Sequence, residues 1–307
     1  MAKPEILVLT PMVQPAARAA LAERFTVHGP DQAEAALASH GPAIAGLVAT
    51  GRERVDAALL DLLPGLRILA CFSAGTDNID AAALAARGIR LTTTSAVLAE
   101  EVADLAMALL VMARRRLVAA DAHVRGGAWA AGQGFPFGRS IQGKRLGLLG
   151  YGHIGAAIAR RAAAAGLALR YCARSLRPGL DIPFHATPLA LARDSDLLMV
   201  ASSGGAANRN LVDAAVIRAL GPAGTLVNIA RGEVVEEAAL LAALEDGGLG
   251  SAGLDVFQDE PRVDPRFAAL PNVVLAPHIA SATVETRDAM GAHVVASLTE
   301  ALLQGKA

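Results

Sequence analysis

Cysteine is nearly absent from this chain: Cys71 and Cys172 are the only two among 307 residues. They lie far apart inside apolar runs, without a Cys-x-x-Cys or Cys/His spacing. The pattern predicts two reduced thiols in a hydrophobic core. It excludes a disulfide-stapled scaffold and a cysteine-ligated metal centre, and we expect no metal.

Charge of one sign is also lacking, since 28 basic and 29 acidic residues leave a formal net charge of −1. Proteins that bind nucleic acid or anionic lipid usually carry a basic excess. The longest stretch without a charged residue, 267–284, contains two prolines, Asn272 and His278, and does not predict a membrane helix. We therefore expect neither a nucleic acid nor a membrane as partner. The N-terminus resembles no secretory signal, which predicts a cytoplasmic protein.

Short apolar runs alternate with alanine-rich helical stretches along the whole chain. At 53% hydrophobic and 19% charged residues the chain is predicted to be globular, with about two domains. The predicted strands are 6–10, 46–50, 67–72, 90–94, 145–149, 168–173, 197–201, 225–229, 251–255 and 273–276. Such alternation predicts an α/β protein with two doubly wound parallel sheets covered by helices.

Two long helical patterns divide the chain. The first, 98–118, is followed by an irregular stretch to residue 139, and the second, 284–304, closes the sequence. We expect one domain of residues 1–97 and 285–307, with a second domain of residues 98–284 inserted into it.

The strand at 145–149 runs into a glycine loop, Gly150-Tyr151-Gly152-His153-Ile154-Gly155, and then into a helical stretch. A Gly-x-Gly-x-x-Gly loop between a strand and a helix, with another strand following, predicts a dinucleotide site. The glycines allow a tight turn and close approach of a pyrophosphate, whose charge the helix N-terminus favours.

The end of the next strand lacks the acidic residue that would bind ribose hydroxyls and repel a 2′-phosphate. Arg174, Ser175 and Arg177 stand there instead and could bind a phosphate. The alternative is a pair of solvated arginines. We expect NADP(H) to be preferred, with NAD(H) possible.

Three later segments each place a polar residue just after an apolar strand: Arg231, then Asp255 with Glu260, then His278. Ligands of a doubly wound sheet bind at such strand ends. Arginine can hold a carboxylate and polarise a carbonyl, histidinium can donate a proton, and a neighbouring carboxylate can keep that histidine protonated. These are the groups needed to reduce a 2-oxo acid.

Each of these residues also has a structural interpretation. Asp255 could cap a helix, Glu260 could be a surface acid before a proline, and Arg231 could pair with Glu236 or Glu237. Their occurrence together at successive strand ends favours the catalytic interpretation.

In its motifs the chain resembles the D-isomer-specific 2-hydroxyacid dehydrogenase family over nearly its full length. The segments that carry the resemblance are, in order, 72–80, 97–104, 150–155, 228–232, 253–261 and 277–278. The resemblance implies a Rossmann cofactor domain inserted into a flavodoxin-like substrate domain. It also implies that Arg231 binds the substrate carboxylate and carbonyl, that Glu260 orients the histidine, and that His278 is the acid/base.

The resemblance further implies that Asp255 lies beside the nicotinamide, that Ile229 lines its pocket, and that the backbone of Ala74 and Gly75 receives the substrate carboxylate. A glycine-containing turn after a strand can present N–H groups to an anion, which agrees with the last role. His153 departs from the family pattern, because arginine is common at that place.

Another departure is Ala99, which stands where threonine is common. The remaining histidines, among them His28, His40 and His123, belong to no matching motif and are expected to be ordinary polar residues. Within the family the chain looks most like the NADPH-dependent glyoxylate and hydroxypyruvate reductases. Hydroxyphenylpyruvate reduction is the alternative activity, and a non-catalytic nicotinamide-binding sensor or corepressor is the alternative of another class.

The aromatic residues of the stretch 119–139 predict a surface that packs against a partner chain. In the resembling family this region joins two cofactor domains, so we expect a homodimer.

Overall fold

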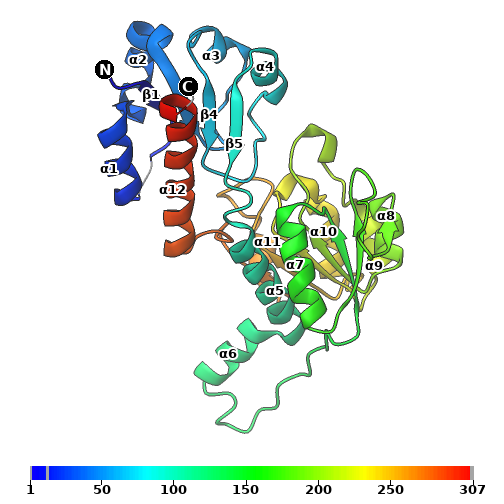
Figure 1. The fold of residues 1–307 in the computed structure, drawn as a ribbon. Coiled ribbons are helices and arrows are strands. Elements are labelled where there is room, and N and C mark those ends of the chain that lie inside the picture. Colours follow the sequence, from blue (N-terminus) through cyan, green and yellow to red (C-terminus); the bar gives the residue numbers. More distant parts are fainter. Residues whose placement is uncertain (1, 12–13, 305–307) are drawn as a thin grey trace. The chain divides into compact units, whose positions relative to one another are not determined.

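A computed structural model describes residues 2–11 and 14–304 (Figure 1). Residues 1, 12–13 and 305–307, which belong to the domain predicted at the two ends of the chain, lie outside the described residues. By its internal contacts the chain divides into two compact units. We call Met1–Leu98 with Ser281–Ala307 unit 1, and Ala99–Ala280 unit 2.

Unit 1 is built on a parallel sheet whose strands, among the described residues, follow the order β2-β1-β3-β4-β5. The strands are β1 (Glu5–Val8), β2 (Thr26–His28), β3 (Ile44–Ala49), β4 (Ile68–Cys71) and β5 (Arg90–Thr93). This is the order of a flavodoxin-like doubly wound sheet. The predicted fold class is confirmed for this unit.

Helices pack around this sheet. They are α1 (Pro15–Arg24), α2 (Ala33–His40), α3 (Ala57–Asp61), α4 (Ala81–Ala86) and α12 (Val284–Thr299), which continues into a π-helical turn (Glu300–Gln304). The helix predicted at 284–304 is therefore present. It packs against α1 so closely that a Cβ at Gly291 would lie 2.9 Å from the Cβ of Ala17. The end of the chain thus completes the unit in which the chain begins.

Unit 2 has a larger parallel sheet, of order β12-β11-β10-β9-β6-β7-β8 in the described part of the chain. The strands are β6 (Arg145–Leu149), β7 (Ala168–Cys172), β8 (Phe184–His185), β9 (Leu197–Val200), β10 (Thr225–Asn228), β11 (Ser251–Leu254) and β12 (Val273–Leu275). The chain winds outward in both directions from β6, which confirms the predicted Rossmann fold.

The helices of unit 2 lie along the sheet, except α6, which with its following loop projects away from it (Figure 1). They are α5 (Ala99–Arg115), α6 (Leu117–Arg125), α7 (His153–Ala164), α8 (Pro188–Arg193), α9 (Ala214–Leu220), α10 (Glu237–Glu245) and α11 (Pro265–Ala269). No helix among the described residues is long and apolar enough to cross a membrane.

One predicted helix, 98–118, is wrong in its extent. The structure ends α5 at Arg115, and Arg116 takes a left-handed conformation (φ 53°) before α6 begins. The returning loop accounts for this break, because the Arg139 N–H donates to the Arg114 carbonyl (2.8 Å) and the Arg116 guanidinium lies 5.8 Å from the centre of the Phe135 ring. The apolar sequence pattern continues across Arg116, so the sequence alone does not indicate the helix break.

Two short strands were not predicted, β2 and β8. Each lies at the edge of its sheet and is partly exposed, so it lacks the continuous apolar run that marks the inner strands. Both cysteines are free and buried, as predicted. Burial raises the pKa of the Cys71 and Cys172 thiols, which keeps them in the unreactive protonated form.

Candidate active site

The glycine loop joins β6 to α7 as predicted. Gly150 has φ 102°, and a Cβ there would lie 2.7 Å from the backbone of Ala201 on the neighbouring segment. A Cβ at Gly155 would lie 2.4 Å from the Gly150 carbonyl oxygen. A Cβ at Gly152 would meet no atom within 4 Å. The outer glycines are therefore needed for packing, while the middle glycine leaves open space in front of the loop.

That open space lies at the N-terminus of α7. Gly152 is the N-cap of α7 and provides no side-chain hydrogen bond to the first turn. That turn begins with His153 and Ile154. The first N–H groups of a helix lack intrahelical acceptors and favour an anion. The loop therefore fits the pyrophosphate of a dinucleotide.

A hydrogen bond through Tyr171 fixes the turn after β7. The buried Tyr171 hydroxyl accepts the Arg177 N–H (2.8 Å), and the Tyr171 ring lies 5.1 Å from that of Tyr151 in the glycine loop. Arg174, Ser175 and Arg177 are exposed. Tyr171 thus couples the glycine loop to the turn that carries the arginines, a role that sequence reasoning missed.

At the carboxyl end of β10, Asn228 holds the turn that presents Arg231. Its side-chain amide donates to the Arg231 carbonyl (3.0 Å) and accepts the Ala230 N–H (3.0 Å). Ile229 between them is buried. The Arg231 guanidinium donates to the Ala230 carbonyl (2.7 Å), which directs it along this turn.

Asp255 follows the adjacent strand, β11, and is fully buried. Its two carboxylate oxygens accept the N–H groups of Ile279 (2.8 Å) and Ala280 (3.0 Å), and its carbonyl accepts the His278 N–H (2.8 Å). Burial raises the pKa of the Asp255 carboxyl, and the two N–H donors oppose that rise. Asp255 therefore anchors the loop after β12 rather than capping a helix.

The loop held by Asp255 carries His278, which has a left-handed backbone (φ 55°). Its Nδ1 lies 2.7 Å from Oε2 of Glu260, and both side chains are partly exposed (34% and 26%). The other Glu260 oxygen accepts the Phe257 N–H (3.1 Å). A non-glycine residue with positive φ costs on the order of 1–3 kcal/mol and is typical of functional sites.

The Arg231 turn and the Glu260 segment are in direct backbone contact through Gly232. A Cβ at Gly232 would lie 1.9 Å from the carbonyl carbon of Phe257. The Gln258 N–H also donates to Glu237 (3.0 Å), which follows the same turn. The structure thus brings the predicted residues Arg231, Glu260 and His278 to the carboxyl ends of three adjacent strands, and sequence reasoning did not single out Gly232.

In unit 1 the predicted anion-binding turn follows β4. The Ser73 hydroxyl accepts the Gly51 N–H (3.0 Å) and donates to the Gly75 carbonyl (2.6 Å). Among the residues that the structure describes, no acceptor is bonded to the N–H of Ala74 or Gly75. Ser73 therefore holds a turn with two N–H groups available for an anion.

Two cations approach each other in the same unit. Partial burial lowers the pKa of Arg287, and the charge of Arg52 lowers it further. Arg287 lies in α12, and its helical sequence context gave no sign of such a neighbour.

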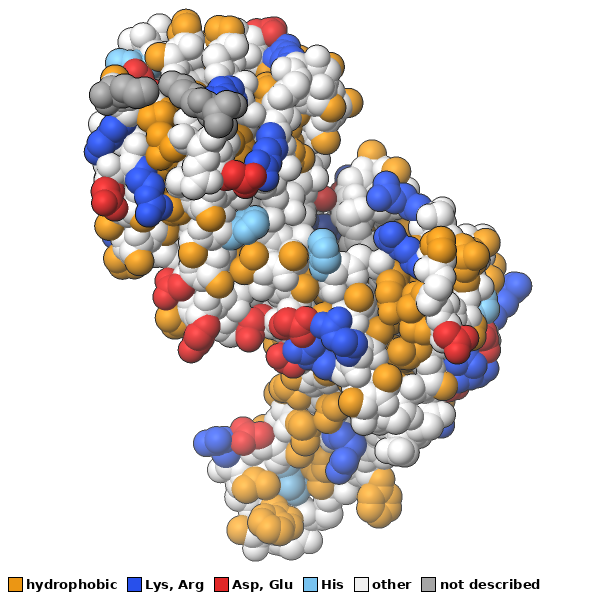
Figure 2. All heavy atoms as spheres, viewed as in Figure 1, with side chains coloured by type: hydrophobic (Ala, Val, Ile, Leu, Met, Phe, Trp, Pro, Cys, Tyr) orange, Lys and Arg blue, Asp and Glu red, His pale blue; other side chains and the backbone are white. Residues whose placement is uncertain are grey.

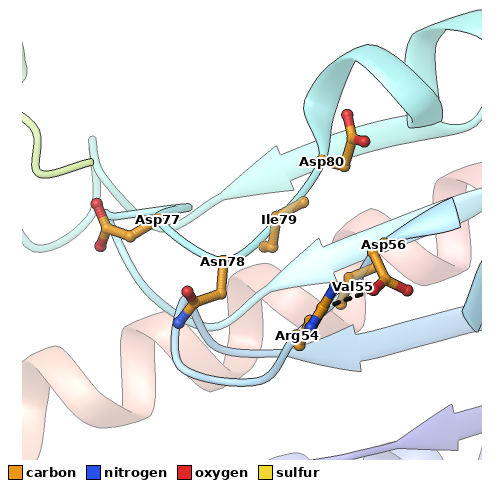
Figure 3. Close-up of a pocket in the computed structure, with 7 residues that line it drawn as sticks. All are labelled: Arg54, Val55, Asp56, Asp77, Asn78, Ile79 and Asp80. Atoms are coloured by element: carbon orange, nitrogen blue, oxygen red, sulfur yellow. Dashed lines mark ion pairs between the residues drawn. The ribbon is translucent and has the colours of Figure 1, made fainter. Parts of the chain in front are cut away.

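An open pocket of unit 1 adjoins the Arg52 segment (Figure 3). Its lining residues are Arg54, Val55, Asp56, Asp77, Asn78, Ile79 and Asp80. Arg54 pairs with Asp56 (2.6 Å), and Val55 bridges to Ile79. Three carboxylates make the lining acidic, which disfavours an anionic 2-oxo acid.

Comparisons with known proteins identify the family of the chain. The family model for the NAD-binding domain of D-isomer specific 2-hydroxyacid dehydrogenases matches residues 107–280. The chain is 43% identical over 296 residues to a 2-ketogluconate reductase of Gluconobacter oxydans, covering 96% of this chain and 94% of the relative. It is 42% identical over 270 residues to a hydroxyphenylpyruvate reductase of Plectranthus scutellarioides, covering 88% and 86%.

A solved structure also matches the fold of the chain. The crystal structure of an NADPH-dependent glyoxylate/hydroxypyruvate reductase from Sinorhizobium meliloti, in complex with NADP and malonate, matches with a TM-score of 0.90 and 40% identity, covering 100% of this chain and 96% of that one. Sequence and fold thus agree over both units, and the chain belongs to the D-isomer-specific 2-hydroxyacid dehydrogenases, oxidoreductases that use a nicotinamide cofactor.

Proposed function

We propose that this protein reduces a small 2-oxo acid of the glyoxylate or hydroxypyruvate type to the D-2-hydroxy acid, with NADPH as reductant. The observation that carries the proposal is the 2.7 Å contact between His278 and Glu260, at the strand end next to the turn of Arg231. His278 follows β12 and Arg231 follows β10, the strands on either side of β11, so a proton donor and a cation lie at the same edge of the sheet, as carbonyl reduction of an anionic substrate requires.

The roles of the three side chains follow from their chemistry. Arg231 binds the substrate carboxylate and polarises the carbonyl oxygen. A nicotinamide cofactor, when bound, would supply the hydride for the carbonyl carbon. His278 donates the proton to the oxygen through Nε2, because Nδ1 faces Glu260. Glu260 contacts Nδ1 at 2.7 Å and so orients the ring with Nε2 toward the substrate.

The other proposed contacts position substrate and cofactor. The N–H groups of Ala74 and Gly75 receive the substrate carboxylate. Asp255 and Ile229 would border the nicotinamide of a bound cofactor. The proposal for NADPH rests on the exposed Arg174 and Arg177 and on the absence of an acid at the end of β7.

We further propose a homodimer formed through α6 and the loop after it. Figure 2 shows hydrophobic side chains gathered on this projection. Its exposed apolar residues are Leu117, Val118, Val124, Trp129 and Phe137. A contiguous exposed apolar surface of this kind is typical of an interface. Light scattering at micromolar concentration should give twice the chain mass, and a monomeric mass would refute the proposal.

The activity is tested by NADPH oxidation with a panel of glyoxylate, hydroxypyruvate, pyruvate, hydroxyphenylpyruvate and 2-ketogluconate, the last two because relatives are named for them. We expect the highest kcat/KM with glyoxylate or hydroxypyruvate. Faster turnover of hydroxyphenylpyruvate would favour the alternative activity. Tight NADPH binding without turnover of any member would favour the sensor or corepressor instead.

A further inference from the structure

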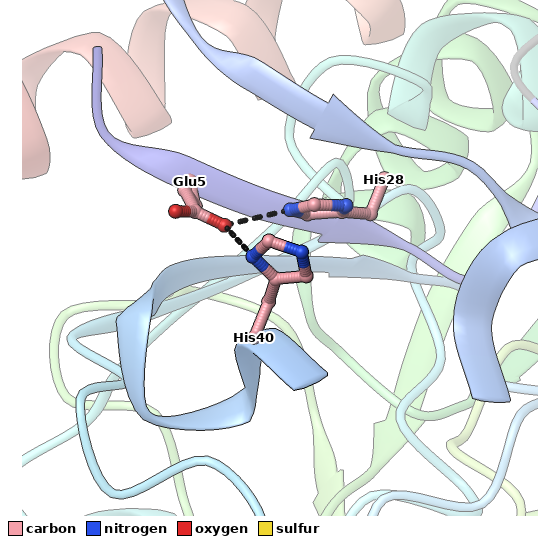
Figure 4. Close-up of side chains that lie close together, drawn as sticks. All are labelled: Glu5, His28 and His40. Atoms are coloured by element: carbon pink, nitrogen blue, oxygen red, sulfur yellow. Dashed lines mark hydrogen bonds and ion pairs between the residues drawn. The ribbon is translucent and has the colours of Figure 1, made fainter. Parts of the chain in front are cut away.

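Unit 1 brings together three side chains that no motif connects: Glu5, His28 and His40 (Figure 4). Glu5 begins β1, His28 ends β2 at the sheet edge, and His40 ends α2. His28 pairs with Leu7 across the parallel strands, so it shares the face of the sheet with Glu5, two residues from Leu7. The sheet register therefore creates this juxtaposition.

The three side chains converge on a single oxygen. Oε2 of Glu5 lies 2.8 Å from Nε2 of His28 and 3.1 Å from Nδ1 of His40, as the dashed lines in Figure 4 mark. All three candidate donor atoms lie within 4.8 Å of one another. A tetrahedral Zn²⁺ with bonds of about 2.0–2.1 Å separates its ligand atoms by about 3.3 Å. The two contacts of Glu5 are therefore within about 0.2–0.5 Å of the separation between zinc ligands, and the two imidazole nitrogens lie within 4.8 Å of each other.

The surroundings also suit a metal. His28 is largely buried (13% exposed) and Glu5 is partly buried (25%), so two of the ligands are held in place by the sheet. His40 is about half exposed (48%), which leaves a path for an ion and for water in the remaining coordination position. Imidazole nitrogen and carboxylate oxygen are the ligand types that Zn²⁺ accepts.

We propose that Glu5, His28 and His40 form a binding site for Zn²⁺ or a similar divalent transition-metal ion. The bound ion joins the edge strand β2 and the end of α2 to β1, and so stabilises unit 1. The site lies outside the residues assigned to 2-oxo acid reduction, and its occupancy is independent of that activity. Sequence reasoning expected no metal because these three residues have no ligand spacing in the chain.

The test uses Co²⁺ as a spectroscopic probe and Zn²⁺ as a competitor, with the full chain. We expect one equivalent of Co²⁺ to give the visible absorption of a tetrahedral ion, Zn²⁺ to displace it, and Zn²⁺ to raise the melting temperature until a chelator is added. His40→Gln should weaken binding by more than the roughly 10 to 100-fold that loss of an outer-shell partner costs.

A matched control is His123→Gln, which removes a partly buried histidine of α6 whose ring nitrogen bonds the Gln133 carbonyl, far along the chain from Glu5, His28 and His40. This variant should bind Co²⁺ like the parent. His40 is half exposed, so the His40→Gln variant should fold. His28 is largely buried, and its replacement risks unfolding unit 1. Glu5→Gln is therefore the second ligand deletion. Unchanged Co²⁺ spectra and affinity in both His40→Gln and Glu5→Gln would overturn the proposal, as would the absence of saturable binding to the parent.

Discussion

Replacing Gly232 by alanine should damage the candidate active site without touching any of the three proposed catalytic side chains. A Cβ at this position would lie 1.9 Å from the carbonyl carbon of Phe257, 2.0 Å from its oxygen and 2.3 Å from the nitrogen of Gln258. Favourable contacts between carbon atoms occur at about 3.5–4.0 Å. The two backbone segments must therefore separate by about 1.5 Å, and neither can rotate away as a side chain would.

The separation displaces either Arg231 or the segment that ends at Glu260. A misplacement of about 1 Å in a catalytic group costs on the order of 100-fold in rate. We therefore expect kcat/KM of Gly232→Ala to fall by about 100-fold or more. Overpacking should also destabilise unit 2 by about 1–3 kcal/mol, the usual cost of an added carbon in a well-packed site.

The assay is steady-state NADPH oxidation, combined with thermal unfolding of the same preparations. Gly29→Ala is the control, because Gly29 has φ −80° and a Cβ there meets no atom within 4 Å. It should retain the activity and stability of the parent. A Gly232→Ala variant with kcat/KM within threefold of the parent would show that the contact with Phe257 does not position the catalytic groups.

Further predictions concern the proton donor, the cofactor and the thiols. His278→Gln should lose about 100 to 10,000-fold in kcat, because it removes the proposed proton donor. Glu260→Gln should keep more activity, because it alters only the group that contacts Nδ1 of His278 (2.7 Å); a kcat equal to that of the parent in His278→Gln would exclude the role of His278. Gly152→Ala should melt like the parent yet raise KM for NADPH, since its Cβ enters open space reserved for the pyrophosphate. Arg174→Ala should raise KM for NADPH about 10 to 100-fold more than for NADH, and equal cofactor efficiencies in the parent would refute the NADP assignment. Cys71 should resist alkylation at pH 8 until the protein unfolds, because burial raises its pKa; fast labelling of the folded protein would contradict this.

The family and both sheets could be predicted from local patterns. An inner parallel strand must be apolar on both faces, so nearly all inner strands produce recognisable runs. The glycine loop must be glycine where Gly150 approaches the Ala201 backbone, and that requirement is visible in the chain. Arg231, Glu260 and His278 were predicted because each directly follows or lies near the end of such a strand.

Contacts between distant segments could not be predicted in this way. The break at Arg116 depends on Arg139 and Phe135, which return from a loop, while the helical pattern of the segment continues unchanged. The edge strand β2 is too short and too exposed to produce an apolar run. Its register nevertheless decides that His28 lies beside Glu5.

The amino-acid sequence was enough to predict the family and the two parallel sheets, because strand ends, glycine turns and the order of motifs are properties of neighbouring residues. Which side chains touch became visible only in the folded chain. Gly232 against Phe257, Tyr171 against the Arg177 turn, and the convergence on Glu5 each join residues that are separated along the chain. Such contacts arise from how strands and helices pack, and side-chain pattern alone does not specify distances between elements.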